Sequence, residues 1–305
     1  AVGLGAVQTL LEEGYAESWF DSPLIVACAA LAVVCLALFV ERQLTSDNPV
    51  VDLRVLRYRS LWAGCICAAV LGMGLYGAMF AVPIFAQGVM HYTSQQTGML
   101  MLPGALASAF AMPMMAVLLK WFEPRVLVAA GSLLVIASLY WMAGMNPQTN
   151  EESLYWPLIV RGFGRELMFL PLRMATFGAV PVQDVGKATG LYNLTRQLGG
   201  SIGIAILTTV LASRTAFHRS VLVEKLGASD VATAERVQMM TGAFTAKGFD
   251  PASAKQQART MLDGSVNLQA TVMSFAESFW LVAVVFVCMM PLILLLGKVK
   301  PGAKP

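Results

Sequence analysis

The chain has 305 residues, of which 57% are hydrophobic and 13% are charged, and its mean hydropathy is +0.66. This composition is typical of an integral membrane protein and excludes an ordinary water-soluble domain. The net charge is only +3, and the basic residues lie in short connections between apolar runs, which argues against a nucleic-acid partner.

The cysteines and histidines do not indicate catalytic or metal chemistry. All five cysteines lie within apolar runs, where a thiol packs as a small hydrophobic group. Cys65 and Cys67 are two residues apart, which on a helix separates them by about 200° and prevents both from binding one metal ion. The two histidines, His91 and His218, lie in polar connections. We therefore expect no metal site, no catalytic residues and no enzyme activity.

Residues 1–22 predict the end of a truncated transmembrane helix followed by an outer turn. Residues 1–11 are apolar but shorter than the roughly 20 residues that a span needs, and they lack the basic start of a signal peptide. The earlier part of this helix is therefore expected to be missing. Residues 23–59 then predict a complete transmembrane linker helix and a cytoplasmic linker.

Apolar runs long enough to cross a bilayer continue along the rest of the chain. The seven predicted spans are 23–40, 60–86, 97–119, 126–145, 156–180, 188–212 and 279–297. Helices are expected, because backbone groups inside a bilayer must be satisfied internally and no alternating barrel strands are visible. The last six spans, within residues 60–297, predict one six-helix bundle in an all-α membrane fold.

Lysine and arginine are distributed unequally between alternate short loops. One set of loops, together with the C-terminal tail, contains Arg42, Arg54, Arg57, Arg59, Lys120, Arg125, Lys187, Lys298, Lys300 and Lys304. The other short loops, at 12–22, 87–96 and 146–155, contain neither residue type. Cytoplasmic loops are the richer ones in lysine and arginine. The multi-pass chain is therefore predicted to end in a cytoplasmic tail, residues 298–305.

Residues 213–278 form a polar insert before the last span, and the alternation places this insert outside the cytoplasm. Its apolar residues recur near helical spacing, and the sequence GFDP at 248–251 predicts a turn followed by a proline-led helix start. Two short amphipathic helices are expected here. They would form a soluble cap, a gate or a surface on which a partner docks.

The segment NLTRQLGGSIGIAI, residues 193–206, resembles the 14-helix drug:proton antiporters of the major facilitator superfamily, the EmrB/QacA-like branch. Residues 7–23, 47–60, 92–113 and 269–280 resemble further segments of that family in the same order. The resemblance implies the C-terminal six-helix half of such a transporter, preceded by one complete linker helix and the remnant of another. The N-terminal half, which holds the family's proton-coupling carboxylates, is expected to be missing.

The same segment carries two sets of candidate residues. Small residues four apart let two helices approach closely. This helix-packing set is Gly199, Gly200 and Gly203. Asn193, Arg196 and Gln197 share one helix face. Because an arginine at a helix centre costs about 2.5–3.5 kcal/mol on insertion scales, Arg196 is expected to point into the bundle or a cavity, with snorkelling to the inner headgroups as the alternative.

The resemblance makes span 156–180 the family's twelfth helix, which is expected to line the central cavity. The family pattern there is small and apolar, and Arg165, Glu166 and Arg173 depart from it. Glu166 and Arg173 project within about 20° of each other, whereas Arg161 and Arg165 form a second cationic strip. Our hypothesis is that Glu166 lies in the translocation cavity or its periplasmic wall, pairs with Arg165 or a nearby span, and influences charged-drug selectivity. The alternative is an ion pair that only locates the helix.

The resemblance implies multidrug efflux by proton-coupled antiport through alternating access, with small amphipathic drug-like substrates and no cofactor beyond the proton gradient. The expected location is the bacterial cytoplasmic (inner) membrane. The expected partners are the lipid bilayer, the missing N-terminal half and a periplasmic adaptor protein. A non-transporting truncated membrane scaffold, or an exporter of a metabolite or siderophore, remains an alternative. The sequence that precedes residue 1 distinguishes the scaffold from a transporter.

Overall fold

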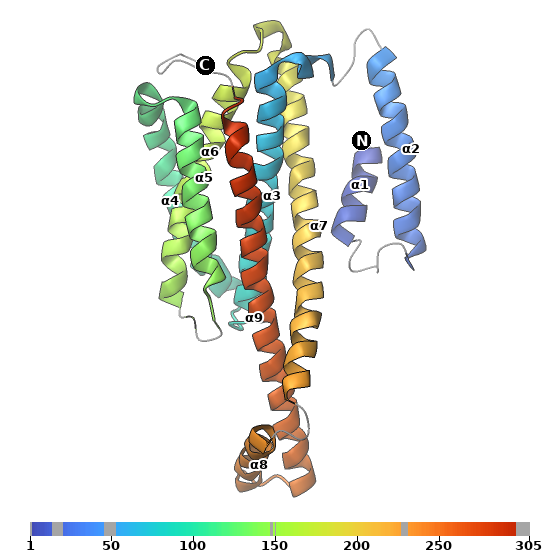
Figure 1. Ribbon diagram of the computed structural model, residues 1–305, viewed down its shortest axis with the longest axis vertical. Coiled ribbons are helices and arrows are strands. Elements are labelled where there is room, and N and C mark those ends of the chain that lie inside the picture. The colour runs from blue at the N-terminus through green and yellow to red at the C-terminus, as the bar shows by residue number, and fades with distance from the viewer. Residues whose placement is uncertain are drawn as a thin grey trace.

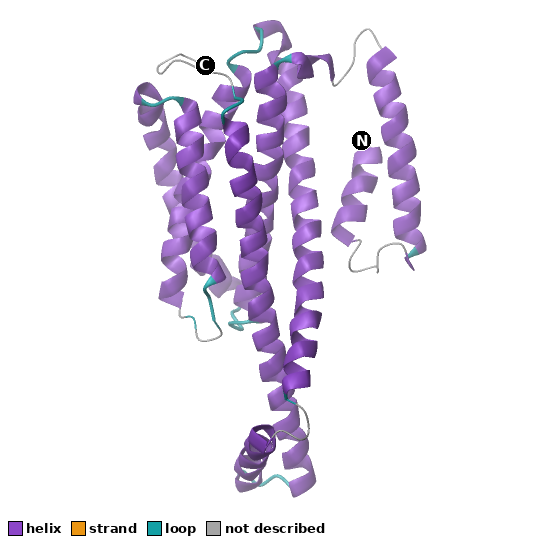
Figure 2. Cartoon of the chain, in the orientation of Figure 1, coloured by secondary structure: helices purple, strands orange, loops and turns teal. Residues whose placement is uncertain are grey.

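The structure is a computed structural model that describes residues 2–13, 21–45, 53–146, 149, 151–226 and 231–296. Within these ranges all regular secondary structure is helical, as Figure 2 shows, and the predicted all-α membrane fold is confirmed. The predicted outer turn before residue 21 and the linker before residue 53 fall partly outside the described residues. The predicted tail, 298–305, falls wholly outside them.

The helices follow one another with few intervening residues. Their bounds are α1 (Val2–Glu13), α2 (Pro23–Thr45), α3 (Arg59–Gly88), α4 (Ser94–Trp121), α5 (Pro124–Ala143), α6 (Glu151–Phe177), α7 (Val185–Lys225), α8 (Val231–Ala246) and α9 (Pro251–Ile293). Two short 3-10 turns, η2 (Leu53–Arg57) and η3 (Val182–Asp184), precede α3 and α7. Each of the seven predicted spans overlaps one long helix.

Five of the described helices are long and apolar enough to cross a membrane: α3, α4, α5, α7 and α9. The linker helix α2 contains a shorter apolar stretch, Pro23–Phe39. The five do not include α6, because Arg161, Arg165, Glu166 and Arg173 interrupt its apolar sequence. Its 27 residues nevertheless extend about 40 Å, which is long enough to cross a bilayer.

Helices α3 to α7 and α9 form one bundle, in which α6 packs against both α4 and α5, and α3 packs against α7 and α9 (Figure 1). Helix α1 packs against α2 and touches α7, so these two helices lie beside the bundle. The core is partly aromatic: the rings of Phe85 and Phe275 meet edge-on with centroids 5.3 Å apart. Outside, Phe110 and Leu133 are 72% and 58% exposed, as expected for a surface that faces lipid.

Three glycines of α7 let this helix approach α3 closely. A Cβ atom at Gly199 would meet the backbone of Ala69, and a Cβ atom at Gly203 would lie 2.6 Å from the Cα atom of Met73. A Cβ atom at Gly200 would meet the ring of Tyr76. Such distances are too short for a real side chain, so the two backbones can lie this close only because these residues have none.

Local hydrogen bonds fix where α4 and α9 begin. Thr93 Oγ1 accepts a bond from the backbone N–H of Gln96 at 3.3 Å, and Gln96 Oε1 accepts one from the backbone N–H of Thr93 at 2.9 Å. This reciprocal pair is a capping box. Before α9, Gly248 has a positive φ of 94°, Asp250 caps the helix, and Pro251 occupies its first turn. The predicted turn and proline-led start are thereby confirmed.

The insert differs from the prediction of two short helices. Helix α7 is one 41-residue helix and α9 is one 43-residue helix, so within the described residues only α8 is separate and short. The prediction was wrong because no proline or glycine interrupts residues 204–226, and α7 therefore continues into the polar region. The extensions of α7 and α9 lie side by side below the bundle in Figure 1.

Ion pairs join these two extensions. Arg219 Nη2 lies 2.7 Å from Asp263 Oδ1. Nearer the bundle, Glu277 of α9 contacts two residues of α7, with 3.2 Å to Arg214 Nε and 3.0 Å to His218 Nε2. The extensions are therefore connected by polar contacts at more than one level along their length.

Candidate functional site

A cavity of about 140 Å³ lies within the bundle, between α3, α4, α5, α6 and α9. Its lining is mostly apolar and includes Leu71, Leu75, Met79, Met101, Leu139 and Phe286. Three polar side chains also line it, those of Arg161, Arg165 and Ser108. At about 1.5 Å per residue, the two arginines lie about 15 and 21 Å from the start of α6, near the middle of its length.

Close contacts on two sides fix how α6 is rotated about its axis. A Cβ atom at Gly162 would meet the carbonyl oxygen of Gly104 on α4, and a Cβ atom at Gly164 would lie 2.9 Å from the carbonyl oxygen of Gly131 on α5. Ser108 Oγ of α4 also lies within hydrogen-bond distance of two carbonyl oxygens, 3.1 Å from that of Gly104 and 3.2 Å from that of Gly162. With α6 held on both sides, the direction of its remaining side chains is determined.

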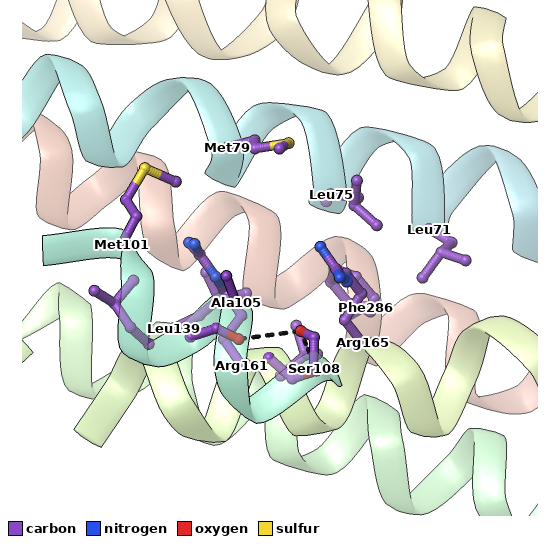
Figure 3. A pocket seen from close by; sticks show the side chains of 15 residues that line it. Leu71, Leu75, Met79, Met101, Ala105, Ser108, Leu139, Arg161, Arg165 and Phe286 are labelled. Carbon is purple, nitrogen blue, oxygen red and sulfur yellow. Dashed lines mark hydrogen bonds between the residues drawn. The ribbon is translucent and has the colours of Figure 1, made fainter. Parts of the chain in front are cut away.

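The arginine side chains of α6 extend into the cavity. Arg161 and Arg165 are one turn apart and therefore project from the same face of the helix. Figure 3 shows their guanidinium groups reaching from α6 toward α3, where Leu75 and Met79 line the opposite side. The hydroxyl of Ser108 instead points to backbone carbonyls, as the dashed line in Figure 3 indicates. The guanidinium groups are therefore the polar groups that a ligand in this cavity would meet.

Glu166 does not line the cavity but binds a residue that does. Its Oε1 atom lies 3.0 Å from Nε and 2.8 Å from Nη2 of Arg165, and the side chains of Arg165 and Glu166 are 37% and 13% exposed. Arg165 is one of the two partners that the sequence hypothesis offered for Glu166. The proposed influence of Glu166 on a ligand therefore acts through Arg165.

Arg173 and Arg196 form a second cluster, farther toward the C-terminal end of α6. Both guanidinium groups lie over the ring of Phe169, at 4.6 and 5.9 Å from its centroid. Arg173 Nη2 is also 3.5 Å from Asn193 Oδ1, the long limit of a hydrogen bond. Arg196 thus points toward α6 within the bundle, which is the first of the two alternatives predicted for it.

Gln197, the third residue of the predicted polar face, has a different partner. It is exposed, and Tyr76 of α3 donates a hydrogen bond to its Oε1 atom at 3.3 Å. Asn193 and Arg196 instead approach α6. The predicted polar face is therefore divided between two neighbouring helices and does not converge on the central cavity.

The cavity is lined by side chains that are suited to binding a ligand. It offers two guanidinium groups within apolar walls, which is the composition of a site for an amphipathic small molecule. In the part of the chain that the structure describes, no three histidine, cysteine, aspartate or glutamate side chains gather as a metal site would require. Cys65 and Cys67 are buried free thiols on α3.

Among the charged residues of the cavity lining, Arg161 was missing from the candidate residues that the sequence suggested. The sequence did contain its signal, because Arg161 and Arg165 are four apart on one helix and form a cationic strip. The choice fell on Arg165, Glu166 and Arg173 because these depart from the family pattern. That departure carries no information about which face of the helix meets the cavity.

These features define a multi-pass, all-helical membrane protein with a cavity between its spans. The sequence model of the Major Facilitator Superfamily matches residues 9–204, and the chain belongs to this superfamily. The predicted membership is confirmed. The match begins in α1 and ends within α7, so it covers the helices that surround the cavity except α9.

The chain is similar to bacterial resistance proteins. It is 28% identical to the multidrug export protein EmrB of Escherichia coli strain K12 over 293 residues, which cover 96% of this chain and 56% of that protein. It is 30% identical to EmrB of Haemophilus influenzae, over 74% of this chain and 44% of that protein. The fatty acid resistance protein FarB of Neisseria gonorrhoeae is 24% identical, over 96% and 56%. The resemblance to the EmrB-like branch is confirmed, and the chain spans about half the length of these relatives.

Proposed function

We propose that this chain is the C-terminal portion of a transporter that exports multiple drugs by proton-coupled antiport. The observation that carries the proposal is the cavity near the middle of a superfamily bundle, where alternating access requires a binding site. The similarity to proteins named for multidrug export supports the substrate class. The driving force is the proton gradient, and a six-helix N-terminal half supplies the other wall of the cavity.

The proposed location is the bacterial cytoplasmic membrane, with the C-terminus on the inside. The unequal distribution of lysine and arginine between alternate short loops supports this orientation. With this orientation, α8 and the extensions of α7 and α9 lie in the periplasm. We propose this segment as the place where a periplasmic adaptor protein docks.

Dye efflux from whole cells tests the proposal. Cells that express this chain joined to an N-terminal half should export a fluorescent dye faster than control cells, and collapse of the proton gradient should abolish the difference. The 305-residue chain alone should confer no efflux, because half of the cavity wall is absent. Export that persists without the gradient would contradict antiport, and resistance conferred by the isolated chain would contradict the half-transporter.

The variant Glu166→Gln tests the role of the charged helix. It leaves Arg165 without a charged partner and raises the positive charge beside the cavity by one. Resistance to cationic drugs should therefore fall relative to resistance to anionic drugs. The matched control is Glu152→Gln, an exposed position at the outer end of the same helix. If Glu166→Gln left both the drug profile and its pH dependence unchanged, the ion pair would only locate α6.

A further inference from the structure

A second pocket lies at the end of the bundle opposite α8, where α3 and α5 begin and α9 ends (Figure 1). Its volume is about 440 Å³, within the range of about 300–1,000 Å³ that is typical of small-molecule sites. The lining combines three polar residues, Arg59, Ser60 and Arg125, with leucines 294–296. None of these residues lines the central cavity, so the pocket is a separate feature of the bundle.

The lining of this pocket carries positive charge that no described carboxylate balances. Arg59 is exposed and Arg125 is partly buried, and neither forms an ion pair with a described residue. Tyr58 also lines the pocket, but it donates its hydroxyl group to Asp184 Oδ2 at 3.1 Å. The guanidinium group of Arg57 lies 4.0 Å from the same oxygen atom. The charge of Asp184 therefore serves Arg57 and Tyr58, and both arginines of the lining are left for a ligand.

Two buried polar atoms of the lining have no hydrogen-bond partner. One is Oγ of Ser60, a residue that is only 5% exposed, and the other is Nε of Arg125. Buried polar groups are normally paired, because an unpaired one keeps the cost of its removal from water. Both groups can donate a hydrogen bond, so a ligand with acceptor oxygen atoms would supply the missing partner.

The helix ends around the pocket also favour an anion. α3 begins at Arg59 and α5 at Pro124, and no side chain caps the first N–H groups of either helix. Such N–H groups have no partner within their helix and attract negative charge. The end of α9 opposes this little, because the N–H groups of leucines 294–296 donate to the carbonyl oxygens of residues 291–293. Glu123, which precedes α5, is exposed and lies outside the lining.

The position of the pocket indicates that the anion is a lipid. Because the apolar helices α3 and α5 begin here, the pocket lies at the level of the lipid head groups. Leu294 is 75% exposed, so an apolar surface lies directly beside the polar part of the lining. Basic pockets between helices on the cytoplasmic side of a membrane bind acidic lipid head groups. In the orientation proposed above, this end of the bundle is the cytoplasmic one.

We propose that Arg59, Ser60 and Arg125 bind the phosphate group of an anionic phospholipid, whose acyl chains lie along leucines 294–296. The two guanidinium groups donate charge-assisted hydrogen bonds to the phosphate oxygen atoms, and Ser60 donates a further one. The bound lipid connects the beginnings of α3 and α5 with the end of α9. This assignment goes beyond the proposed function, because it does not depend on whether the chain transports a drug.

Native mass spectrometry of the 305-residue chain, freed of lipid in a non-ionic detergent, tests the assignment. The chain is titrated with dioleoyl phosphatidylglycerol, dioleoyl phosphatidylcholine and soluble glycerol 3-phosphate. The first phosphatidylglycerol molecule should bind about tenfold or more tightly than phosphatidylcholine, because the arginines repel the choline cation. Glycerol 3-phosphate lacks acyl chains and should bind more weakly than phosphatidylglycerol. Equal affinities for the two lipids would overturn the anion site, and equal affinities for phosphatidylglycerol and glycerol 3-phosphate would overturn the lipid assignment.

Substitutions in the lining locate the effect. Arg125→Gln should weaken the binding of phosphatidylglycerol by about tenfold and Ser60→Ala by about fivefold, without a change for phosphatidylcholine. The matched control is Lys120→Gln, which removes a positive charge at the same end of the bundle. Lys120 is exposed and lies outside the lining, so this variant should bind both lipids as the unaltered chain does. Unchanged phosphatidylglycerol affinity in Arg125→Gln and Ser60→Ala, or an equal loss in Lys120→Gln, would overturn the proposal.

Thermal unfolding separates the loss of the lipid from the loss of the fold. Because the Ser60 hydroxyl group has no protein partner, Ser60→Ala should leave the Tm of the lipid-free chain unchanged. Phosphatidylglycerol should raise the Tm of the unaltered chain more than phosphatidylcholine does, and Ser60→Ala should reduce this difference. Gel filtration identifies a variant that fails to fold, and the comparison of the two lipids on the unaltered chain then decides by itself. Equal Tm values with the two lipids would contradict the proposal.

Discussion

The contact between α3 and α7 leads to a prediction whose magnitude can be worked out from the structure. A Cβ atom at Gly199 would lie 2.6 Å from the Cα atom and 2.7 Å from the carbonyl carbon of Ala69. Both are backbone atoms, so no side chain can move aside, and the helices must separate by several tenths of an ångström. Overpacking of this kind costs about 1–3 kcal/mol. Gly199→Ala therefore destabilises the bundle at the contact between α3 and α7.

A glycine elsewhere on the same helix provides the matched control. Gly190 also lies on α7, and a Cβ atom there would meet nothing within 4 Å. Replacing glycine by alanine inside a helix gains about 1 kcal/mol of helix propensity at either position, so this gain cancels when the two variants are compared. The free energy of unfolding of Gly199→Ala should therefore be about 1–3 kcal/mol lower than that of Gly190→Ala.

Unfolding by SDS in mixed micelles, followed by tryptophan fluorescence, measures this difference. The chain contains six tryptophans, which report on the loss of helix packing. A difference below about 0.5 kcal/mol, no more than an ordinary surface substitution causes, would refute the reasoning that the glycines set the distance between α3 and α7. Gly203→Ala repeats the test one turn along, against the backbone of Met73.

Three further predictions concern the polar insert. Gly248→Ala places a side chain at a φ of 94° and should destabilise the turn before α9 by about 1 kcal/mol, seen as faster amide exchange in α8. Hydrogen bonds from Ser253 hold the pKa of Asp250 below its ordinary value of 3.8. The stability that this carboxylate adds is therefore present above pH 3.8, and it is lost as the pH falls through the lower pKa of the folded state. Asp250→Asn should flatten this dependence in helicity measured by circular dichroism. Glu277→Gln keeps an acceptor for His218 but removes the negative charge. Because the Glu277 side chain is 41% exposed, thermal unfolding should show that the free energy of unfolding falls by less than about 1 kcal/mol.

Most of the bundle was predictable because the bilayer sets a simple length requirement. The run 97–119 lies inside α4, and the helix extends beyond it only to the capping box at Thr93 and the end at Trp121. The insert was less predictable because the change from apolar to polar residues near Ser213 marks a change of surroundings and not the end of a helix. A change of surroundings does not by itself end a helix, and neither glycine nor proline occurs between Gly203 and Gly227.

The cavity was only partly predictable, because it depends on the rotation of one helix. Helical geometry fixes the angle between Glu166 and Arg173, but no local rule states which direction faces the other helices. That direction is set by the contacts of Gly162 and Gly164 with two glycines that lie far away in the sequence, Gly104 and Gly131. Arg161 and Arg165 therefore line the cavity, whereas Glu166 is connected to it through its ion pair with Arg165.

If the substrate is an anion, linkage limits the role that Glu166 can have in proton coupling. Protonation of Glu166 removes the negative charge beside Arg165 and therefore strengthens the binding of an anion. Because linkage is reciprocal, the anion would then also strengthen proton binding, which is the sign of cotransport. Antiport needs the opposite sign, in which a bound proton weakens substrate binding. In the proposed antiporter Glu166 therefore adjusts selectivity, and the coupling carboxylate belongs to the N-terminal half. Efflux by Glu166→Gln should accordingly change its substrate preference while it still requires the proton gradient.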